Sequence, residues 1–510
     1  MFRDERRFEV WETICQRGIR AFASQLTPDV LAETAQRAGL VVAKSPLCLV
    51  NLVWLGIAAA LDKTQNFATI LTVTLKLLED QQEFYATQVG RAKKQAQRQT
   101  TKRGARRRKK ICRRSKHSPY RDDPTLVSEE AFAKARSRMP LAFWVNLIVV
   151  LSERFGQKHR RLLEFRGFRL LAMDGTTIDL PNWKPLRNYF GTARNARGNQ
   201  NAQARMVMLQ FPLARVPFRY ELCPLDQGEV TIARRLVQHM CSNDLVLVDA
   251  CFASYGLLWD IQRRGAFFAI PIKRELNLQH TKRLGRHDAL MRWSPKDSRG
   301  QWRKEGLPKS IELRVITYAI PGFRPQRLAT NVLDARRISR DDWVRMATDC
   351  SENGKFQPGL YHRRWEIETT YRELKVEQGM EGGLRSRTPE SIQYEVAGHV
   401  VLYLLVRWLM VEAAVERGKD PLRLSFKHAL RELLALHPSL VTAAPEWIPI
   451  LLVRLLNRIA EHEVPYRPGR RYPRRKSSTN YKTKKPNTKS TNRSKPRRAN
   501  RSSTKHTTKG

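Results

Sequence analysis

Acidic residues are scarce in this chain of 510 residues. Asp and Glu number 48 against 94 Lys and Arg, which leaves a formal net charge of +46. A chain with so little negative charge is poorly suited to binding cations over its whole surface, and it requires a polyanionic partner or counterions at neutral pH. Nucleic acid is the commonest such partner, and a membrane surface is the lesser alternative.

Several motif classes are also missing. The seven cysteines form an odd set with no CxxC pair and no metal-ligand spacing, so they predict reduced thiols rather than a disulfide framework. The eleven histidines include no HExxH or similarly paired spacing, which argues against a zinc site or a histidine nucleophile. No serine nucleophile motif is visible either. The chemistry, if there is any, must therefore rest on other groups.

Long apolar runs are absent as well. No stretch approaches the roughly 18 uninterrupted apolar residues of a membrane span, and the first residues, MFRDERRFEVWETICQRG, alternate charge where a signal peptide would be apolar. We therefore expect a cytoplasmic protein with no membrane partner. The hydrophobic content of 41% is nevertheless sufficient for a folded body of two to four domains.

The positive charge is concentrated in two segments. Residues 91–121 form a connection whose first 30 residues carry about 14 Lys and Arg and no acids, and the tail 465–510 carries about 17 and none. Neither has the apolar content to fold alone, so we expect a flexible linker and a disordered basic tail that bind DNA without sequence preference. Residues 1–90 show helical periodicity and helix start signals, and they predict an N-terminal helical module that could bind DNA ends.

The middle of the chain alternates strand and helix patterns. Apolar runs with strand composition begin at Phe168 and recur at 204–211, 217–223, 244–250 and 266–272, with an amphipathic helix before the last of them. This alternation predicts an α/β fold with a mixed sheet and flanking helices. We assign residues 122–274 to the first part of this core, 275–345 to a β-rich insertion, and 346–464 to the completion of the core and the C-terminal helices.

One predicted helix, YHRRWEIETTYRELK at 361–375, concentrates polar chemistry on one face. At about 100° per residue, Tyr361, Arg364, Glu368 and Lys375 share that face. The remaining acids, Glu366, Glu373 and Glu377, fall on the opposite side, so we expect them to matter little for catalysis. Geometry therefore nominates Glu368 as the reactive carboxylate. The alternative is a solvated helix with i,i+4 ion pairs.

Two further acids end apolar strand patterns. Asp174 ends the run in LLAMDG, and Asp249 ends the run in LVLVDA. Carboxylates at a sheet rim are well placed to hold metal, although Asp-Gly also favours turns and either acid could be a turn or cap residue. Asp179 and Asp244 occupy less suitable positions. Together with Glu368, the two acids suggest a site for two Mg²⁺ ions, with Mn²⁺ able to substitute, that supports phosphoryl transfer.

These residues resemble the DDE transposases of bacterial insertion sequences, in particular insertion-sequence family four. Its signature Y-x2-R-x3-E-x6-K is matched in full by Tyr361, Arg364, Glu368 and Lys375. The family's first two acids are matched by DGTTIDLP at Asp174 and DACFASYGLL at Asp249. The resemblance covers roughly residues 125–430.

The resemblance implies a ribonuclease-H-like core with a β insertion between the second and third acids. It implies catalytic, metal-binding roles for Asp174, Asp249 and Glu368, and DNA contacts by Tyr361, Arg364 and Lys375. Its partners would be double-stranded DNA, both element ends and target, with a homodimer in the synaptic complex on the bacterial nucleoid. Trp293 and Trp302 could stack on an extruded base, although insertion core is the more frequent role of such residues.

Other readings of the sequence stay open. The same three carboxylates would serve a metal-dependent nuclease that hydrolyses DNA without joining it, because hydrolysis and transfer differ only in the attacking group. A non-enzymatic DNA-binding protein would use the helix 361–375 as a phosphate-binding face, although Glu368 would weaken such binding. A third possibility is a decayed transposase that keeps its core residues but has lost recognition of the element ends.

Overall fold

The computed structural model describes residues 20–40, 53, 56–57, 60, 139–194, 200–272, 276–294, 305–319, 325–344 and 359–465. The linker 91–121, the tail beyond residue 465 and most of the N-terminal module lie outside these residues. The described part of that module, 20–40, is helical and contains α2 (Pro28–Arg37), whose first turn is capped by the Thr27 hydroxyl.

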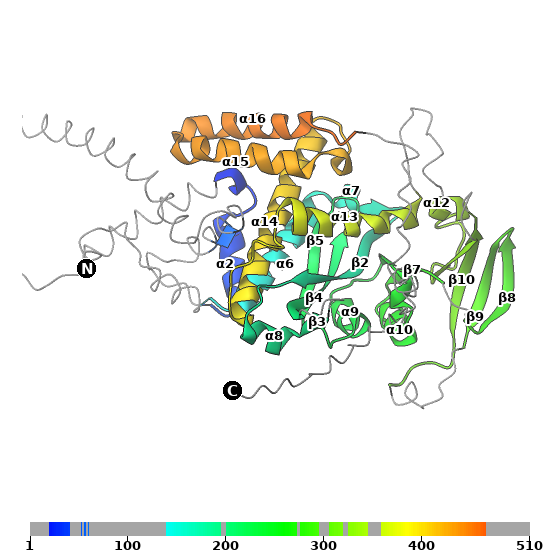
Figure 1. Ribbon diagram of the computed structural model, residues 1–510. Helices are drawn as coiled ribbons and strands as arrows, with labels where there is room; N and C mark the ends of the chain where they lie inside the picture. The colour runs from blue at the N-terminus through cyan, green and yellow to red at the C-terminus, as the bar shows by residue number, and fades with distance from the viewer. Residues whose placement is uncertain are drawn as a thin grey trace, which may run out of the picture. The chain divides into compact units, whose positions relative to one another are not determined.

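A mixed sheet forms the centre of the fold (Figure 1). An inner strand, β2 (Phe168–Asp179), pairs in parallel with β6 (Asp244–Val248), and β6 pairs in parallel with β7 (Phe267–Pro271). On the other side of β2 lies β4 (Gln200–Phe211), which is antiparallel to β2. β5 (Val216–Cys223) in turn pairs with β4 and is antiparallel to it. An antiparallel meander followed by two parallel strands is the ribonuclease-H-like arrangement that the resemblance implies, and the α/β prediction is confirmed.

The strand sequences explain this order. Every residue of β6 is buried, and the first half of β2 is nearly continuous apolar sequence. Strands that are covered on both faces lack the polar alternation of half-exposed strands, so these two belong in the middle of a sheet. The one acid of β6, Asp244, is held by the Arg169 guanidinium at 2.6 Å, which gives it a structural role.

The β-rich stretch extends the same sheet. β11 (Gln326–Thr330) pairs with β7, and β10 (Ile311–Tyr318), β9 (Asp288–Trp293) and β8 (Leu278–Gly285) follow in order outward. The pairing through β7 makes one continuous sheet of 11 strands. Trp293 is 5% exposed and packs edge-on against Tyr255, so its role is core packing. Trp302 lies outside the described residues.

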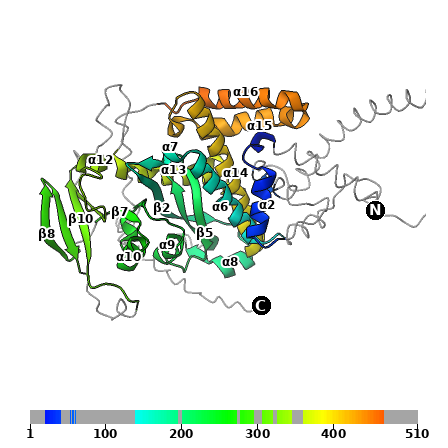
Figure 2. The same cartoon turned by 180° about the vertical axis from the view of Figure 1, so that it is seen from behind.

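Helices cover the sheet. α6 (Leu141–Lys158) and α14 (Pro389–Glu416) pack together and against β5, while α9 (Glu229–Val237) and α10 (Tyr255–Arg263) cover the strands on their other side (Figures 1 and 2). The remaining elements with five residues or more outside the candidate site are α8 (Lys184–Phe190), α12 (Arg340–Val344), α15 (Phe426–Thr442) and α16 (Ile448–Glu461).

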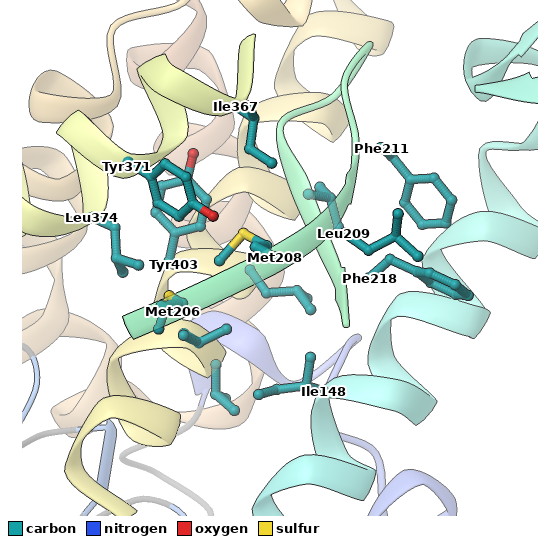
Figure 3. Packing of buried hydrophobic residues seen from close by; sticks show 14 of the residues in the cluster. Ile148, Met206, Met208, Leu209, Phe211, Phe218, Ile367, Tyr371, Leu374 and Tyr403 are labelled. Atoms are coloured by element: carbon teal, nitrogen blue, oxygen red, sulfur yellow. The ribbon is translucent and has the colours of Figure 1, made fainter. Parts of the chain in front are cut away.

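α14 is the most apolar helix of the described chain. By length and composition it could cross a membrane, but 94% of its most apolar window is buried inside the fold. A helix that is apolar on every side is expected in the centre of a large core. Tyr403 of α14, Ile148 of α6 and Met206 and Met208 of β4 belong to one cluster (Figure 3). Tyr371, from the predicted 361–375 helix, packs into the same cluster.

Candidate active site

Asp174 and Asp249 follow paired positions on two neighbouring strands. The parallel register of β2 and β6 pairs Met173 with Val248, and the two acids are the residues that come directly after this pair. β6 ends at Val248, whereas β2 continues to Asp179 and stays paired with β4. The prediction that Asp174 ends its strand is therefore wrong. Asp174 lies in mid-strand, at the point where the neighbouring strand stops and uncovers its edge.

The turn interpretation of Asp174-Gly175 is also wrong. Gly175 pairs with Val207 within the sheet. A Cβ atom on Gly175 would lie 2.7 Å from the Glu229 Cδ atom, so a side chain cannot be placed there unless Glu229 moves. The Glu229 side chain is 34% exposed and flexible, and the position of Gly175 reflects sheet pairing rather than a turn. Asp249 precedes the short 3-10 turn η3 (Ala250–Phe252), and its side chain makes no capping hydrogen bond to that turn.

The predicted helix 361–375 is helical throughout but changes its winding twice. A 3-10 segment, η4 (Leu360–Trp365), leads into the α-helix α13 (Glu366–Arg372), which opens into a π-helical segment, η5 (Glu373–Glu377). The assumption of a uniform 100° per residue is therefore wrong in detail. π-helical segments are rare and are frequent at functional sites.

Arg364 joins the helix to the sheet. Its Nη2 atom donates to Glu368 Oε1 at 2.9 Å, and its Nη1 atom lies 3.3 Å from Asp174 Oδ2. The Arg364 side chain is 7% exposed, whereas that of Glu368 is 45% exposed. The Tyr371 hydroxyl adds a second link, because it donates to the backbone carbonyl of Asp174 at 2.7 Å. The structure therefore brings Asp174, Arg364 and Glu368 into direct contact.

The electrostatics of Asp174 reflect first its burial and then its charged neighbours. Burial raises its pKa, the Gly175 amide and Arg364 lower it, and Glu368 and Asp249 raise it, which together place it at about 6. The Gly175 N–H donates to Asp174 Oδ1 at 2.8 Å. Because Asp249 acts on Asp174 through its charge, the three predicted acids form one electrostatic group. A cation at this group would relieve their mutual repulsion.

Tyr361 and Lys375, the other two residues of the signature, each donate a hydrogen bond to a backbone carbonyl group. The Tyr361 hydroxyl donates to the carbonyl of Val248, the residue before Asp249, at 3.1 Å. The Lys375 Nζ atom donates to the Thr177 carbonyl at 2.8 Å and lies 2.8 Å from Glu381 Oε1. Both therefore hold the helix against the segments that carry the two aspartates.

Two of the acids on the opposite side of the helix, Glu366 and Glu373, are largely buried, whereas Glu377 is 24% exposed and lies 3.6 Å from the Arg372 guanidinium. Arg215 donates from Nε to Glu366 Oε2 at 2.7 Å and from Nη1 to Glu373 Oε1 at 2.9 Å. The Glu373 side chain is 4% exposed. The solvated-helix alternative is wrong for Glu366 and Glu373. Because breaking a buried ion pair typically costs about 3–5 kcal/mol, loss of either acid should lower the stability of the fold. The expectation that these acids matter little for catalysis stays a prediction.

Sequence reasoning missed two residues of this region. Tyr371 lies in the helix itself, but a tyrosine at that spacing gives no signal that it will reach a backbone carbonyl. Arg215 lies in the turn between β4 and β5 with φ 53°, a left-handed conformation that is uncommon for arginine. Its position beside the helix depends on the tertiary fold, so no local pattern reveals it.

The donor chemistry of the site fits a hard divalent ion. Carboxylate oxygens from Asp174, Asp249 and Glu368 are the ligands that Mg²⁺ prefers, and the charges of Glu368 and Asp249 contribute to the raised pKa of Asp174 after burial. Within the described ranges, however, no three acidic, His or Cys side chains converge closely enough to form a ready metal site. Arg364 occupies the position between two of the acids.

Comparisons with known proteins identify relatives of the chain. Residues 166–405 match the family model described as transposase DDE domain. The transposase InsG for insertion sequence element IS4 of Escherichia coli K12 is 28% identical over 316 residues, which are 60% of this chain and 67% of that protein. The InsZ protein of the same strain is 26% identical over 142 residues, which are 28% of this chain and 48% of that protein.

Among solved structures, the chain is similar to a piggyBac transposase in a synaptic complex with hairpin DNA. The sequence identity is 12% and the TM-score is 0.34, with 88% of this chain and 86% of that chain covered.

Proposed function

We propose that this chain, which is similar to the DDE transposases of insertion-sequence family four, cuts DNA at the ends of an insertion sequence and joins the freed 3′-OH ends to target DNA. The observation that supports this reaction is that Asp174, which follows the same paired position of the sheet as Asp249, is joined to Glu368 through Arg364 at an uncovered strand edge. DDE transposases generally use divalent metal ions, and we propose two Mg²⁺ ions, replaceable by Mn²⁺.

We assign the metal ligands to Asp174, Asp249 and Glu368. When bound there, the ions would lower the pKa of an attacking hydroxyl and stabilise the leaving oxygen at the scissile phosphate. The rigid pairing of β2 and β6 fixes the two aspartates relative to each other. The exposed position of Glu368 leaves room for DNA to approach the third carboxylate.

The remaining signature residues position the DNA backbone. Arg364 and Lys375 carry the positive charge of this face, and a guanidinium can grip two phosphate oxygens at once. Tyr361 orients the Asp249 segment through the Val248 carbonyl. The positive charges of Arg364 and Lys375 offset the repulsion between Glu368 and the phosphates that flank the cut.

We further propose that residues 1–90 bind the element ends, that residues 91–121 and 465–510 supply sequence-independent affinity, and that the synaptic complex contains a homodimer. A protein of this kind acts on the bacterial nucleoid, so its compartment is the cytoplasm. The β strands of residues 275–345 extend the catalytic sheet through β7 and could carry part of the DNA surface.

The direct test is a set of single substitutions, Asp174→Asn, Asp249→Asn and Glu368→Gln. Each should abolish Mg²⁺-dependent cleavage of a duplex that carries the element's terminal repeat, while the affinity for the same duplex stays within about threefold. Asp179→Asn is the matched control, because its exposed carboxylate bonds only the Gln203 amide among the contacts observed. Normal cleavage by any of the three variants removes that residue from the assignment. Cleavage without joined products in the wild type would favour a nuclease.

A further inference from the structure

Arg215 lies on the opposite side of α13 from the candidate site. It follows Ala214 in the tight turn between β4 and β5, and its side chain is 11% exposed. Its guanidinium contacts Glu366, the first residue of α13, and Glu373, the residue that follows α13. Burial alone would lower the pKa of Arg215, but the two carboxylates outweigh it and raise the pKa above its usual range. The Arg215 guanidinium therefore binds carboxylates at both ends of α13, a helix about two turns long.

A second set of hydrogen bonds, from α14, holds Glu373 and the turn that carries Arg215. The Tyr403 hydroxyl of α14 donates to Glu373 Oε2 at 2.7 Å. Arg407, one turn further along α14, donates to the Ala214 carbonyl from Nε at 3.0 Å and from Nη2 at 2.9 Å. α14 thus holds both the carboxylate and the turn that presents Arg215. The turn, α13 and α14 form one closed polar network inside an apolar core.

The position of Glu373 gives this network a specific consequence. Glu373 begins the π-helical segment, where the regular α-helical spacing ends. Without a fixed point on each side of the change in winding, α13 could rotate or shift along its axis, and Glu368 would move with it. Because both carboxylates bind the same guanidinium, α13 is held in one orientation about its axis. Glu368 lies between them and points to Asp174 through Arg364.

We propose that Arg215 is a positioning residue of the catalytic site, which acts through Glu366 and Glu373 to hold Glu368 at a fixed distance from Asp174 and Asp249. This inference rests on the proposed function, because it assumes that Glu368 completes the metal site. In this proposal Arg215 acts through the two carboxylates that it binds, without contacting DNA or metal itself. Its effect should appear in metal affinity and turnover rather than in DNA affinity.

A purely structural ion pair would behave differently, and neutralisation of the whole group separates the two roles. Replacement of a buried ion pair by uncharged residues is often neutral for stability, whereas removal of one partner is costly. The triple variant Arg215→Met/Glu366→Gln/Glu373→Gln should therefore melt close to the wild type, and the amide oxygen introduced by Glu373→Gln can still accept from Tyr403. If Arg215 positions Glu368, turnover should remain low although stability has returned.

The experiment measures melting temperature, Mn²⁺ affinity by calorimetry without DNA, and kcat and KM for cleavage of the terminal-repeat duplex. Arg215→Lys should melt near the wild type, because an ammonium still pairs with one carboxylate, but its kcat should fall about ten- to a hundredfold with KM little changed. Its Mn²⁺ affinity should fall as well. The triple variant should show the same losses.

Arg219→Lys is the matched control. Arg219 is equally buried in β5 and pairs with Glu153 of α6 at 3.0 Å, away from α13. Its kcat and Mn²⁺ affinity should stay at wild-type values. The inference is overturned if the triple variant or Arg215→Lys cleaves and binds Mn²⁺ like the wild type, or if Arg219→Lys loses as much activity as Arg215→Lys. Glu368→Gln in the same assay distinguishes failure of this inference from failure of the proposed function, because cleavage by that variant would refute the metal-site assignment itself.

Discussion

Arg364 donates to Glu368 across one helical turn at 2.9 Å, and the same guanidinium lies 3.3 Å from Asp174. A single cation therefore neutralises two of the three proposed metal ligands. Because the guanidinium and a divalent ion would compete for the same oxygens, metal binding requires these contacts to weaken. A freed Arg364 could then turn to a DNA phosphate.

Arg364→Met should bind Mn²⁺ about three- to tenfold more tightly than the wild type in the absence of DNA, since no side-chain cation competes. The same variant should join a pre-nicked end at least tenfold more slowly at saturating protein, because the phosphate contact is lost. Arg364→Lys should recover part of the joining rate, since an ammonium cannot span two phosphate oxygens. Calorimetry with the metal alone measures the first effect, and Arg363→Met serves as control. Equal or weaker Mn²⁺ binding by Arg364→Met contradicts the competition.

The raised pKa of Asp174 predicts a pH-dependent stability difference. Its pKa rises from 3.8 to about 6, first through burial, so the folded state holds this proton more tightly than the unfolded state. The stability it contributes is present below about pH 4 and is lost as the pH rises through 6. Asp174→Asn lacks the charge at every pH. Relative to the wild type it should gain stability by about 2 kcal/mol between pH 4.5 and pH 8.

Chemical denaturation at pH 4.5, 6 and 8 with a chelator present measures this gain. Asp179→Asn corrects for the general loss of one carboxyl group. A difference between Asp174→Asn and the wild type that does not change with pH would mean that Asp174 ionises as it does in the unfolded chain.

The α/β class with its mixed sheet and a choice of candidate carboxylates could be derived from the sequence, because apolar runs and signature spacing are local patterns. The length of β2 could not. Asp174 and Gly175 resemble a strand end followed by a turn, yet pairing with β4 carries the strand on to Asp179. Such pairing depends on a partner some 30 residues away. Likewise, the change from 3-10 to α to π winding depends on contacts outside the helix.

The opposite face of the 361–375 helix shows the same limit. Charge spacing correctly separates Glu366 and Glu373 from Glu368, but it cannot distinguish a solvated acid from a buried one. Burial here depends on Arg215 and Tyr403, which come from distant segments of the chain. The pattern of the helix alone therefore does not indicate which distant segments its carboxylates will contact in the folded chain.

Lys375 connects the helix to the part of β2 beyond Asp174. Its ammonium contacts the Thr177 carbonyl and Glu381, each at 2.8 Å. Lys375→Ala should therefore slow single-turnover joining of a pre-nicked end at least tenfold, through loss of both a phosphate cation and this link. Its DNA affinity should change less than threefold, because the large net positive charge elsewhere supplies most of the attraction. Arg372→Ala is the control, since the Arg372 side chain is 63% exposed. Joining at the normal rate would remove Lys375 from the site.

The tail offers a prediction that depends on charge alone. Residues 465–510 carry about 17 Lys and Arg and no acids. Each cation that neutralises a phosphate releases counterions, so the logarithm of the association constant falls with the logarithm of salt concentration by roughly 0.9 per contact on duplex DNA. Deletion of residues 467–510 should therefore flatten this dependence, and the loss of slope divided by 0.9 counts the phosphates that the tail contacts.

The control for this deletion is a tail of equal length in which every Lys and Arg is replaced by Gln. It should match the deletion if charge is the cause, whereas a tail that acts by folding or by excluded volume would leave the two variants different. Discrimination between the terminal repeat and unrelated duplex should stay the same in both variants, because phosphate contacts carry no base information. An unchanged slope after deletion would show that the tail does not contact DNA, and reduced discrimination would show that it reads sequence.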